Sequence, residues 1–194
     1  NDGLPDSDVN YNATFSSDDE PGFGGGEYAF NVFDNRLGPG NDKWCCNDPS
    51  PGNPLDGPGH QLDAKLDAGY HILTHFTIAS SNDAPERDPR VWAIEGSRDG
   101  VNFDILFFHA HPTDSIFTAR NQVVRFDAGV DFPMPTEPYS IYRYSVIDSV
   151  GGSAHALGEI EYFGVFVPEP SSFLLAALGL AALGVLCRRR KTRS

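Results

Sequence analysis

The chain has 194 residues, a formal net charge of −13 at pH 7 and 21% charged residues. Its length suits one domain with its own hydrophobic core and short terminal segments. The acidic balance argues against nucleic acid as a partner, because phosphate binding requires basic patches. It is compatible with divalent cations or neutral glycans as ligands.

The amino-terminal segment, residues 1–26, is rich in Asp, Gly, Ser and Asn and ends in three consecutive glycines. Such a composition buries little apolar surface and favours turns. We therefore expect residues 1–26 to form a flexible acidic lead-in to the folded part of the chain.

Residues 27–166 show the pattern of short strands separated by turns. Apolar and aromatic residues alternate with polar ones, and turn-forming clusters such as Asn82–Pro85 and Arg98–Gly100 separate the alternating runs. The predicted strands are Gln61–Leu66, Ile72–Ser80, Val91–Ser97, Phe103–Phe108, Gln122–Phe126, Ile141–Asp148 and Leu157–Phe163. No convincing amphipathic helix precedes residue 170. Seven or more short strands predict an all-β sandwich or barrel.

Several side chains in this region carry an expectation of their own. Trp92 is expected in the core, whereas Trp44 is either a core residue or a partly exposed platform on which a sugar stacks. Arg87 and Asp88 are expected to form an ion pair that shapes their loop.

The adjacent cysteines Cys45 and Cys46 rarely bond to each other in proteins, because the geometry is strained. No second Cys or His pair follows at the spacing of a zinc site. We therefore expect two thiols in a loop rather than a metal site.

The carboxyl-terminal segment, residues 167–194, has three parts. The tripeptide Pro168-Glu169-Pro170 is followed by an uninterrupted apolar run, Phe173–Cys187. As a helix, these 15 residues would reach about 22 Å at ~1.5 Å per residue, which is short for a hydrocarbon core of ~30 Å. A basic cluster then closes the chain: Arg188, Arg189, Arg190, Lys191 and Arg193.

The distribution of charge predicts how this segment would sit in a membrane. Residues 1–170 carry a net charge of −18, and the last seven residues carry +5. Lys and Arg stay on the cytoplasmic side of a membrane-spanning helix, so the body of the protein is expected outside. An exported protein also requires a leader, and the chain starts without one. We expect that a leader was removed or that the chain is a fragment.

The order of these three parts closely resembles the PEP-CTERM sorting signal. The resemblance implies an exosortase-like membrane protease as a partner, processing near Pro168–Pro170, and a transient stay in the inner membrane. A permanent tail anchor is the main alternative, and a buried core helix with a polar end is another.

A second set of motifs follows in a regular order: Phe33-Asp34-Asn35 with Lys43-Trp44, then Asn82–Gly100 with Phe103, then Tyr142–Tyr144 with Leu157–Ile160. Together these pieces resemble the discoidin, or coagulation-factor C-type, domain over most of residues 27–166. The resemblance implies a galactose-binding-like jelly-roll β-sandwich. Members of that family bind glycans, lipids or proteins, and many are carbohydrate-binding modules.

The same resemblance implies a structural Ca²⁺ site. Asp34 would supply the first carboxylate, Asp42 a second oxygen from the same loop, and Glu159 would close the site from the last strand. Backbone carbonyls near Asn31 and Gly158 could complete the six to eight oxygens that Ca²⁺ requires. The alternative is that Asp34 and Asp42 are solvated turn residues that cap backbone N–H groups.

These expectations describe an exported, non-enzymatic protein of the cell envelope or extracellular matrix, whose sandwich domain binds polysaccharide. Three alternatives remain: a structural matrix or adhesion protein without a sugar site, a permanently tail-anchored surface protein, and a hydrolase of matrix polymers. No nucleophile–base set typical of a hydrolase is recognisable in the sequence. The residues that would contact a ligand are not identified by it.

Overall fold

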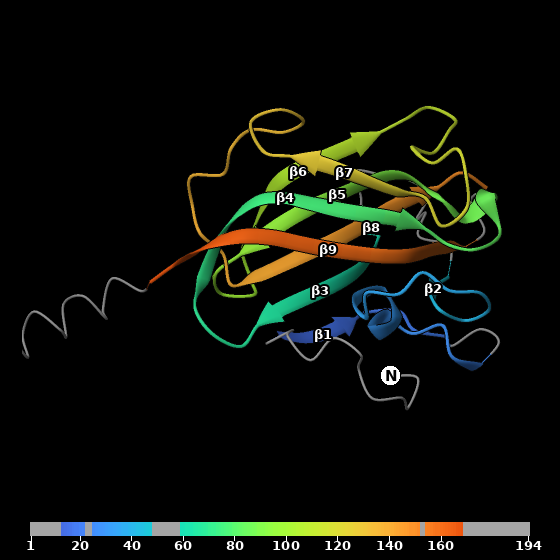
Figure 1. Ribbon diagram of the computed structural model, residues 1–194, viewed down its shortest axis with the longest axis horizontal. Helices are drawn as coiled ribbons and strands as arrows, with labels where there is room; N and C mark the ends of the chain where they lie inside the picture. Colours follow the sequence, from blue (N-terminus) through green and yellow to red (C-terminus); the bar gives the residue numbers. More distant parts are fainter. Residues whose placement is uncertain (1–12, 22–24, 48–58, 152–153, 169–194) are drawn as a thin grey trace, which may run out of the picture.

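The computed structural model describes residues 13–21, 25–47, 59–151 and 154–168, which form two antiparallel sheets packed face to face (Figure 1). The strands are β1 (Ala13–Ser17), β2 (Trp44–Cys46), β3 (His60–Leu66), β4 (Tyr70–Ser80), β5 (Pro89–Ser97), β6 (Phe103–Ala110), β7 (Val123–Asp127), β8 (Ile141–Ser149) and β9 (His155–Val167). Two short 3₁₀ helices, η2 (Ala29–Phe33) and η3 (Pro85–Arg87), lie in the connections. One sheet has the order β1-β3-β8-β5-β6 and the other β2-β9-β4-β7.

The predicted all-β sandwich is confirmed, and each of the seven predicted strands overlaps one of the observed strands β3 to β9. Within the described ranges, no helix is long and apolar enough to cross a membrane. The expected helix at Phe173–Cys187 lies outside the described residues.

Strands β1 and β2 were not anticipated from the sequence. Strand β1 lies inside the segment expected to be a flexible lead-in, and pairs with β3 from Ala13 opposite Leu66 to Ser17 opposite Leu62. Its Phe15 ring stacks on Phe33 of η2 with centroids 4.1 Å apart. This contact and the strand pairing hold the lead-in against the sandwich.

The core is a cluster of aromatic rings contributed by both sheets. Trp92 of β5 is fully buried, as expected from the sequence. It contacts Tyr144 of β8 in its own sheet and Phe76 of β4 in the opposite sheet, at centroid distances of 5.7 and 6.1 Å. The period of two in each strand places these rings on the inner face, where they exclude water.

The ion pair that anchors the loop after η3 differs from the expected one. Asp88 is almost fully buried and pairs with the guanidinium of Arg120, which reaches both carboxylate oxygens. The expectation that Arg87 would be its partner is wrong: the Arg87 guanidinium lies 3.9 Å from Cys45 Sγ instead. Arg120 is distant in sequence, so the local sequence could not suggest it as the partner.

Replacing Arg120 is expected to destabilise the protein strongly. In Arg120→Ala, the Asp88 carboxylate would remain buried without its cation, at a cost of about 3 kcal/mol. Arg125→Ala is the matched control, because Arg125 pairs with Asp127 on the exposed surface, where ion pairs contribute little. Urea denaturation of both variants measures the difference. Equal stability of the two variants would show that the buried Asp88–Arg120 pair contributes no more to the free energy of unfolding than an exposed pair does.

Candidate functional site

Two of the three residues expected to bind a metal lie side by side in the structure. Asp34, which follows η2, and Glu159, in β9, are both buried. Their carboxylates accept hydrogen bonds from the same backbone N–H, that of Arg36, at 3.0 and 3.1 Å. The Arg36 N–H, which donates to both Asp34 and Glu159, therefore holds the segment after η2 against β9.

This pairing has a clear electrostatic signature. Burial, together with the nearby negative charge of Asp34, raises the pKa of Glu159 to about 9. The second carboxylate oxygen of Glu159, Oε1, is buried and meets no hydrogen-bond donor among the described residues. Two acids held together with an unsatisfied oxygen provide the hard oxygen donors that Ca²⁺ prefers.

Asp42, the third expected ligand, lies later in the loop that follows η2, and among the described residues it does not form a three-ligand cluster with Asp34 and Glu159. Its carboxylate packs against Gly38, where a Cβ atom would come within 2.1 Å of Asp42 Oδ2. The residue after it, Lys43, fixes the end of the loop: its buried ammonium group lies 2.7 Å from Asp83 Oδ1 and 3.5 Å from Glu27 Oε1. The loop is thus tied to the rest of the fold immediately beyond Asp42.

The sorting-signal residues are only partly within the described chain. Pro168 is exposed and directly follows β9. Glu169 and Pro170 lie outside the described residues, as does the basic cluster Arg188, Arg189, Arg190, Lys191 and Arg193.

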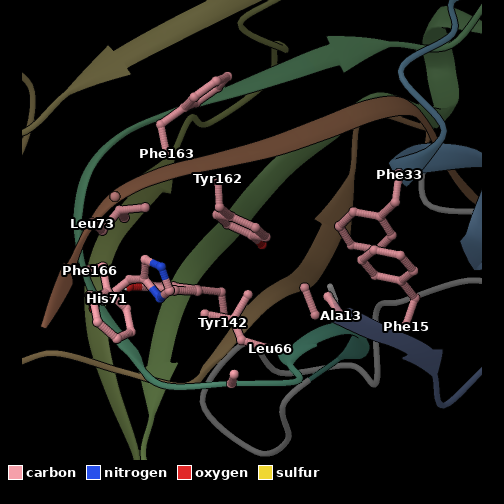
Figure 2. Close-up of a pocket in the computed structure, with 13 residues that line it drawn as sticks. Ala13, Phe15, Phe33, Leu66, His71, Leu73, Tyr142, Tyr162, Phe163 and Phe166 are labelled. Carbon is pink, nitrogen blue, oxygen red and sulfur yellow. Dashed lines mark hydrogen bonds between the residues drawn. The ribbon is translucent and has the colours of Figure 1, made fainter. Parts of the chain in front are cut away.

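A cavity of about 560 Å³ opens between the two sheets, at the end where β3 turns into β4 and where β9 leaves the sandwich. Figure 2 shows the Phe15 and Phe33 rings on one side of it and the Tyr162, His71 and Phe166 rings toward the other. Tyr142, Leu66 and Leu73 are among the remaining lining residues. The volume suits a small ligand, and the walls are mainly aromatic.

Polar groups that border this cavity include the Tyr142 hydroxyl and the His71 imidazole. The Tyr142 hydroxyl donates a hydrogen bond to the carbonyl oxygen of His71 at 2.7 Å. The His71 Nδ1 atom is buried and has no hydrogen-bond partner among the described residues. A ligand with hydroxyl groups could satisfy that nitrogen while an apolar face of the ligand stacks on the rings.

The rim of the cavity depends on Phe166 and the turn beside it. The Phe166 ring lies edge-on to His71, with centroids 5.4 Å apart. Gly69 in the β3–β4 turn has φ of 73°, and a Cβ atom there would come within 2.3 Å of the Phe166 ring. Glycine is required for both the backbone angle and the close approach. Phe163 is also among the lining residues, and its ring stacks on His75 with centroids 4.2 Å apart.

The sequence did not identify this cavity, because its rings come from β1, η2, β4, β8 and β9. The aromatic platform that it did consider, Trp44, is fully buried. The Trp44 indole N–H donates to the Asp19 carbonyl oxygen at 3.0 Å, which is a structural role.

Comparison with known proteins identifies the carboxyl-terminal segment. The PEP-CTERM protein-sorting motif matches residues 166–191. This motif indicates an exported protein with a sorting signal at its carboxyl terminus.

Several solved structures with the same fold are carbohydrate-binding modules. The Clostridium perfringens module CpGH89CBM32-5, in complex with GalNAc-β-1,3-galactose, is 17% identical and has a TM-score of 0.57, covering 79% of this chain and 96% of that one. The family 32 module of C. perfringens NanJ, in complex with galactose, is 15% identical with a TM-score of 0.54 and coverages of 78% and 93%. The family 32 module of AlyQ, in complex with 4,5-unsaturated mannuronic acid, is 10% identical with a TM-score of 0.55 and coverages of 78% and 95%.

One curated relative shares a short segment. The peptide-N(4)-(N-acetyl-β-glucosaminyl)asparagine amidase of Arabidopsis thaliana is 57% identical over 30 residues, which are 16% of this chain and 4% of that protein. The match is too short to transfer an activity. The chain thus carries a PEP-CTERM sorting motif behind a jelly-roll β-sandwich with the fold of the family 32, discoidin-like carbohydrate-binding modules.

Proposed function

We propose that the protein is a non-catalytic, carbohydrate-binding protein of the cell envelope or extracellular matrix, and that it binds exopolysaccharide in the aromatic cavity between its sheets. The observation that carries the proposal is an aromatic-walled cavity in a sandwich with the fold of known carbohydrate-binding modules. A pyranose ring would lie against Phe15, Tyr162 or Phe166, and its hydroxyls would reach His71 Nδ1 and the tyrosine hydroxyls.

Export would proceed through the sorting motif. The apolar run Phe173–Cys187 would hold the protein in the inner membrane with the sandwich outside, and an exosortase-like membrane protease would act near Pro168–Pro170. Because β9 pairs with β4 up to Val167, very few residues separate the sandwich from that site. The folded domain would therefore lie close to the membrane until release.

We further propose that Ca²⁺ binds at Asp34 and Glu159, with Asp42 supplying a further oxygen. The buried, unsatisfied Oε1 of Glu159 supports this assignment. The ion would supply positive charge between two buried acids and fix the loop after η2 onto β9. Its role would be structural, because none of these three residues lines the aromatic cavity.

Truncating Phe166 is expected to weaken glycan binding. Phe166→Ala removes a ring from the cavity rim and should lower the affinity about tenfold, or about 1.4 kcal/mol. Phe108→Ala is the matched control, since Phe108 lies on β6 away from the cavity and both side chains are 54% exposed. Titration calorimetry with exopolysaccharide fragments, galactose and mannuronate oligomers measures the affinities.

The outcomes of that titration separate the two parts of the proposal. Wild-type binding that Phe166→Ala leaves unchanged would move the sugar site elsewhere on the sandwich. A wild-type protein that binds none of these glycans would overturn the function and favour a purely structural matrix protein.

Replacing Glu159 is expected to raise the stability of the metal-free protein. The folded state holds a proton on Glu159 up to a pKa of about 9, whereas the unfolded chain releases it near the ordinary value. The free energy of unfolding therefore decreases as the pH rises through this window. Glu159→Gln has no carboxyl group to ionise and avoids this decrease. With chelator at pH 7, its free energy of unfolding should exceed that of the wild type by up to about 3 kcal/mol.

Calcium supplies the second half of the same measurement. Melting curves with and without Ca²⁺ should show a calcium-dependent rise in the wild type and none in Glu159→Gln. Glu161→Gln, on the same strand, is the control and should keep the rise. A wild-type melting temperature that Ca²⁺ does not change would contradict the assignment.

Processing at the sorting motif is tested in cells that carry an exosortase. Mass spectrometry of the mature protein should show that the basic carboxyl terminus has been removed. A variant in which Pro168, Glu169 and Pro170 are replaced by alanine should keep that terminus. Ser171→Ala and Ser172→Ala are the controls. A wild-type protein that retains Arg193-Ser194 would indicate a permanent tail anchor instead.

A further inference from the structure

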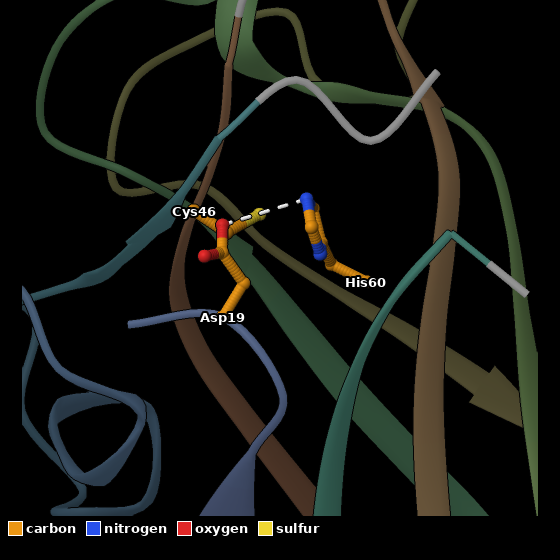
Figure 3. A group of neighbouring side chains, drawn as sticks. All are labelled: Asp19, Cys46 and His60. Atoms are coloured by element: carbon orange, nitrogen blue, oxygen red, sulfur yellow. Dashed lines mark ion pairs between the residues drawn. The ribbon is translucent and has the colours of Figure 1, made fainter. Parts of the chain in front are cut away.

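Three side chains of different donor types converge where β1, β2 and β3 come together. Asp19 lies just after β1, Cys46 is the last residue of β2, and His60 is the first residue of β3. Figure 3 shows the carboxylate, the thiol and the imidazole turned toward one another. One ligand-type atom from each residue lies within 4.8 Å of those of the other two.

One of the three separations matches what a single tetrahedral ion requires. His60 Nε2 and Asp19 Oδ2 are 3.4 Å apart, the separation expected for two atoms that each lie about 2.0–2.2 Å from one Zn²⁺. Zinc–sulfur bonds are about 2.3 Å long. The fully buried Cys46 would need only a small side-chain adjustment to complete a set of nitrogen, oxygen and sulfur donors.

Neighbouring groups hold the Asp19 carboxylate in position and place a second carboxylate near His60. Asn47 donates to both oxygens of the Asp19 carboxylate, from its backbone N–H at 2.6 Å and from its side-chain amide at 3.1 Å. Asp18 Oδ1 lies 3.7 Å from the other ring nitrogen of His60, Nδ1, and accepts a hydrogen bond from the backbone N–H of Gln61. A carboxylate behind a histidine is the usual support of a metal-bound imidazole.

An ion pair alone would explain only part of this arrangement. A protonated His60 between Asp18 and Asp19 accounts for the two carboxylates. It does not account for a thiol at the same point, because the sulfur of a neutral thiol is only a weak hydrogen-bond acceptor. Thiolate, imidazole and carboxylate together are the ligands that zinc sites use.

We propose that Asp19, Cys46 and His60 bind one divalent d-block cation, with Zn²⁺ as the best match. Three protein ligands leave a fourth position for water, since Asp19 and His60 are partly exposed. On binding, a Zn–S bond forms and the thiol proton of Cys46 passes to solvent.

The consequence of such a site would be a clamp between the two sheets. Strands β1 and β3 lie at one edge of the five-stranded sheet, whereas β2 is the edge strand of the other. Strand β2 has three residues and is the shortest of the strands β1 to β9 described above, so few backbone hydrogen bonds hold it. An ion bound to residues from both sheets would lock this edge and the segment after β1.

The test uses the full chain in detergent, without a histidine tag and with Cys187→Ser, so that Cys45 and Cys46 are the only thiols. Equilibrium dialysis followed by metal analysis should give one Zn²⁺ per chain, and Zn²⁺ should raise the melting temperature. Cobalt in place of zinc should give a thiolate-to-cobalt charge-transfer band in the near ultraviolet. A millimolar excess of Ca²⁺ should not displace the metal, which separates this site from Asp34 and Glu159.

Variants identify the ligands. His60→Gln and Cys46→Ser should each weaken Zn²⁺ binding at least tenfold, and Cys46→Ser should remove the cobalt band. Cys45→Ser and His111→Gln are the controls and should bind as the parent does. Because Cys46 is buried and its replacement could impair folding, the partly exposed His60 provides the decisive variant. Zinc binding that survives His60→Gln, a cobalt complex without a thiolate band, or no stoichiometric binding would overturn the proposal.

Discussion

The pairing of β9 with β4 is the constraint on which the rest of the structure depends. It runs from Tyr70 opposite Val167 to Ser80 opposite Leu157, and it joins parts of the molecule with different roles. The first half of β9 places Glu159 against Asp34. The second half supplies Tyr162 and Phe166 to the aromatic cavity and then leads directly into the sorting motif. Strand β9 therefore positions the loop after η2, the aromatic cavity and the start of the sorting motif.

The acidic composition of the protein has a structural counterpart. Several acidic side chains are buried, and each has a different kind of partner. Asp88 is paired with Arg120, Glu27 faces the buried Lys43, and Glu159 shares a donor with Asp34. In the last arrangement two acids lie together without a cation, and burial, together with the negative charge of Asp34, raises the pKa of Glu159 to about 9. Protonation of Glu159 relieves that cost at neutral pH, and the proposed Ca²⁺ would relieve it by taking the place of the proton.

Sequence patterns predicted the strands well where alternation extended over five or more residues. Strand β1 was missed because the Asp-, Gly- and Ser-rich composition around Ala13–Ser17 outweighed a short alternation, and its partner β3 lies far along the chain. Strand β2 was missed because three residues are too few for a period to be visible. Its buried Trp44 could have indicated a strand.

The sequence predicted one of the candidate sites in part and did not predict the other two. Asp34 and Glu159 were placed together through a resemblance to a known family, and the structure does bring their carboxylates onto one N–H group. The aromatic cavity and the Asp19, Cys46 and His60 cluster were not predicted. Their members come from separate elements, and the adjacent thiols resembled no spacing that is typical of a metal site. Long-range β pairing creates such sites, and local sequence does not record it.

The central claim is that the sandwich binds carbohydrate between its sheets, at the end from which the sorting motif leaves. The most direct measurement is a titration with exopolysaccharide fragments, followed by nuclear magnetic resonance of the aromatic side chains. The account predicts saturable shifts for Phe15, Tyr162 and Phe166, with Phe108 unchanged. Shifts confined to the loops at the opposite end of the sandwich, or no shifts at saturating sugar, would contradict it.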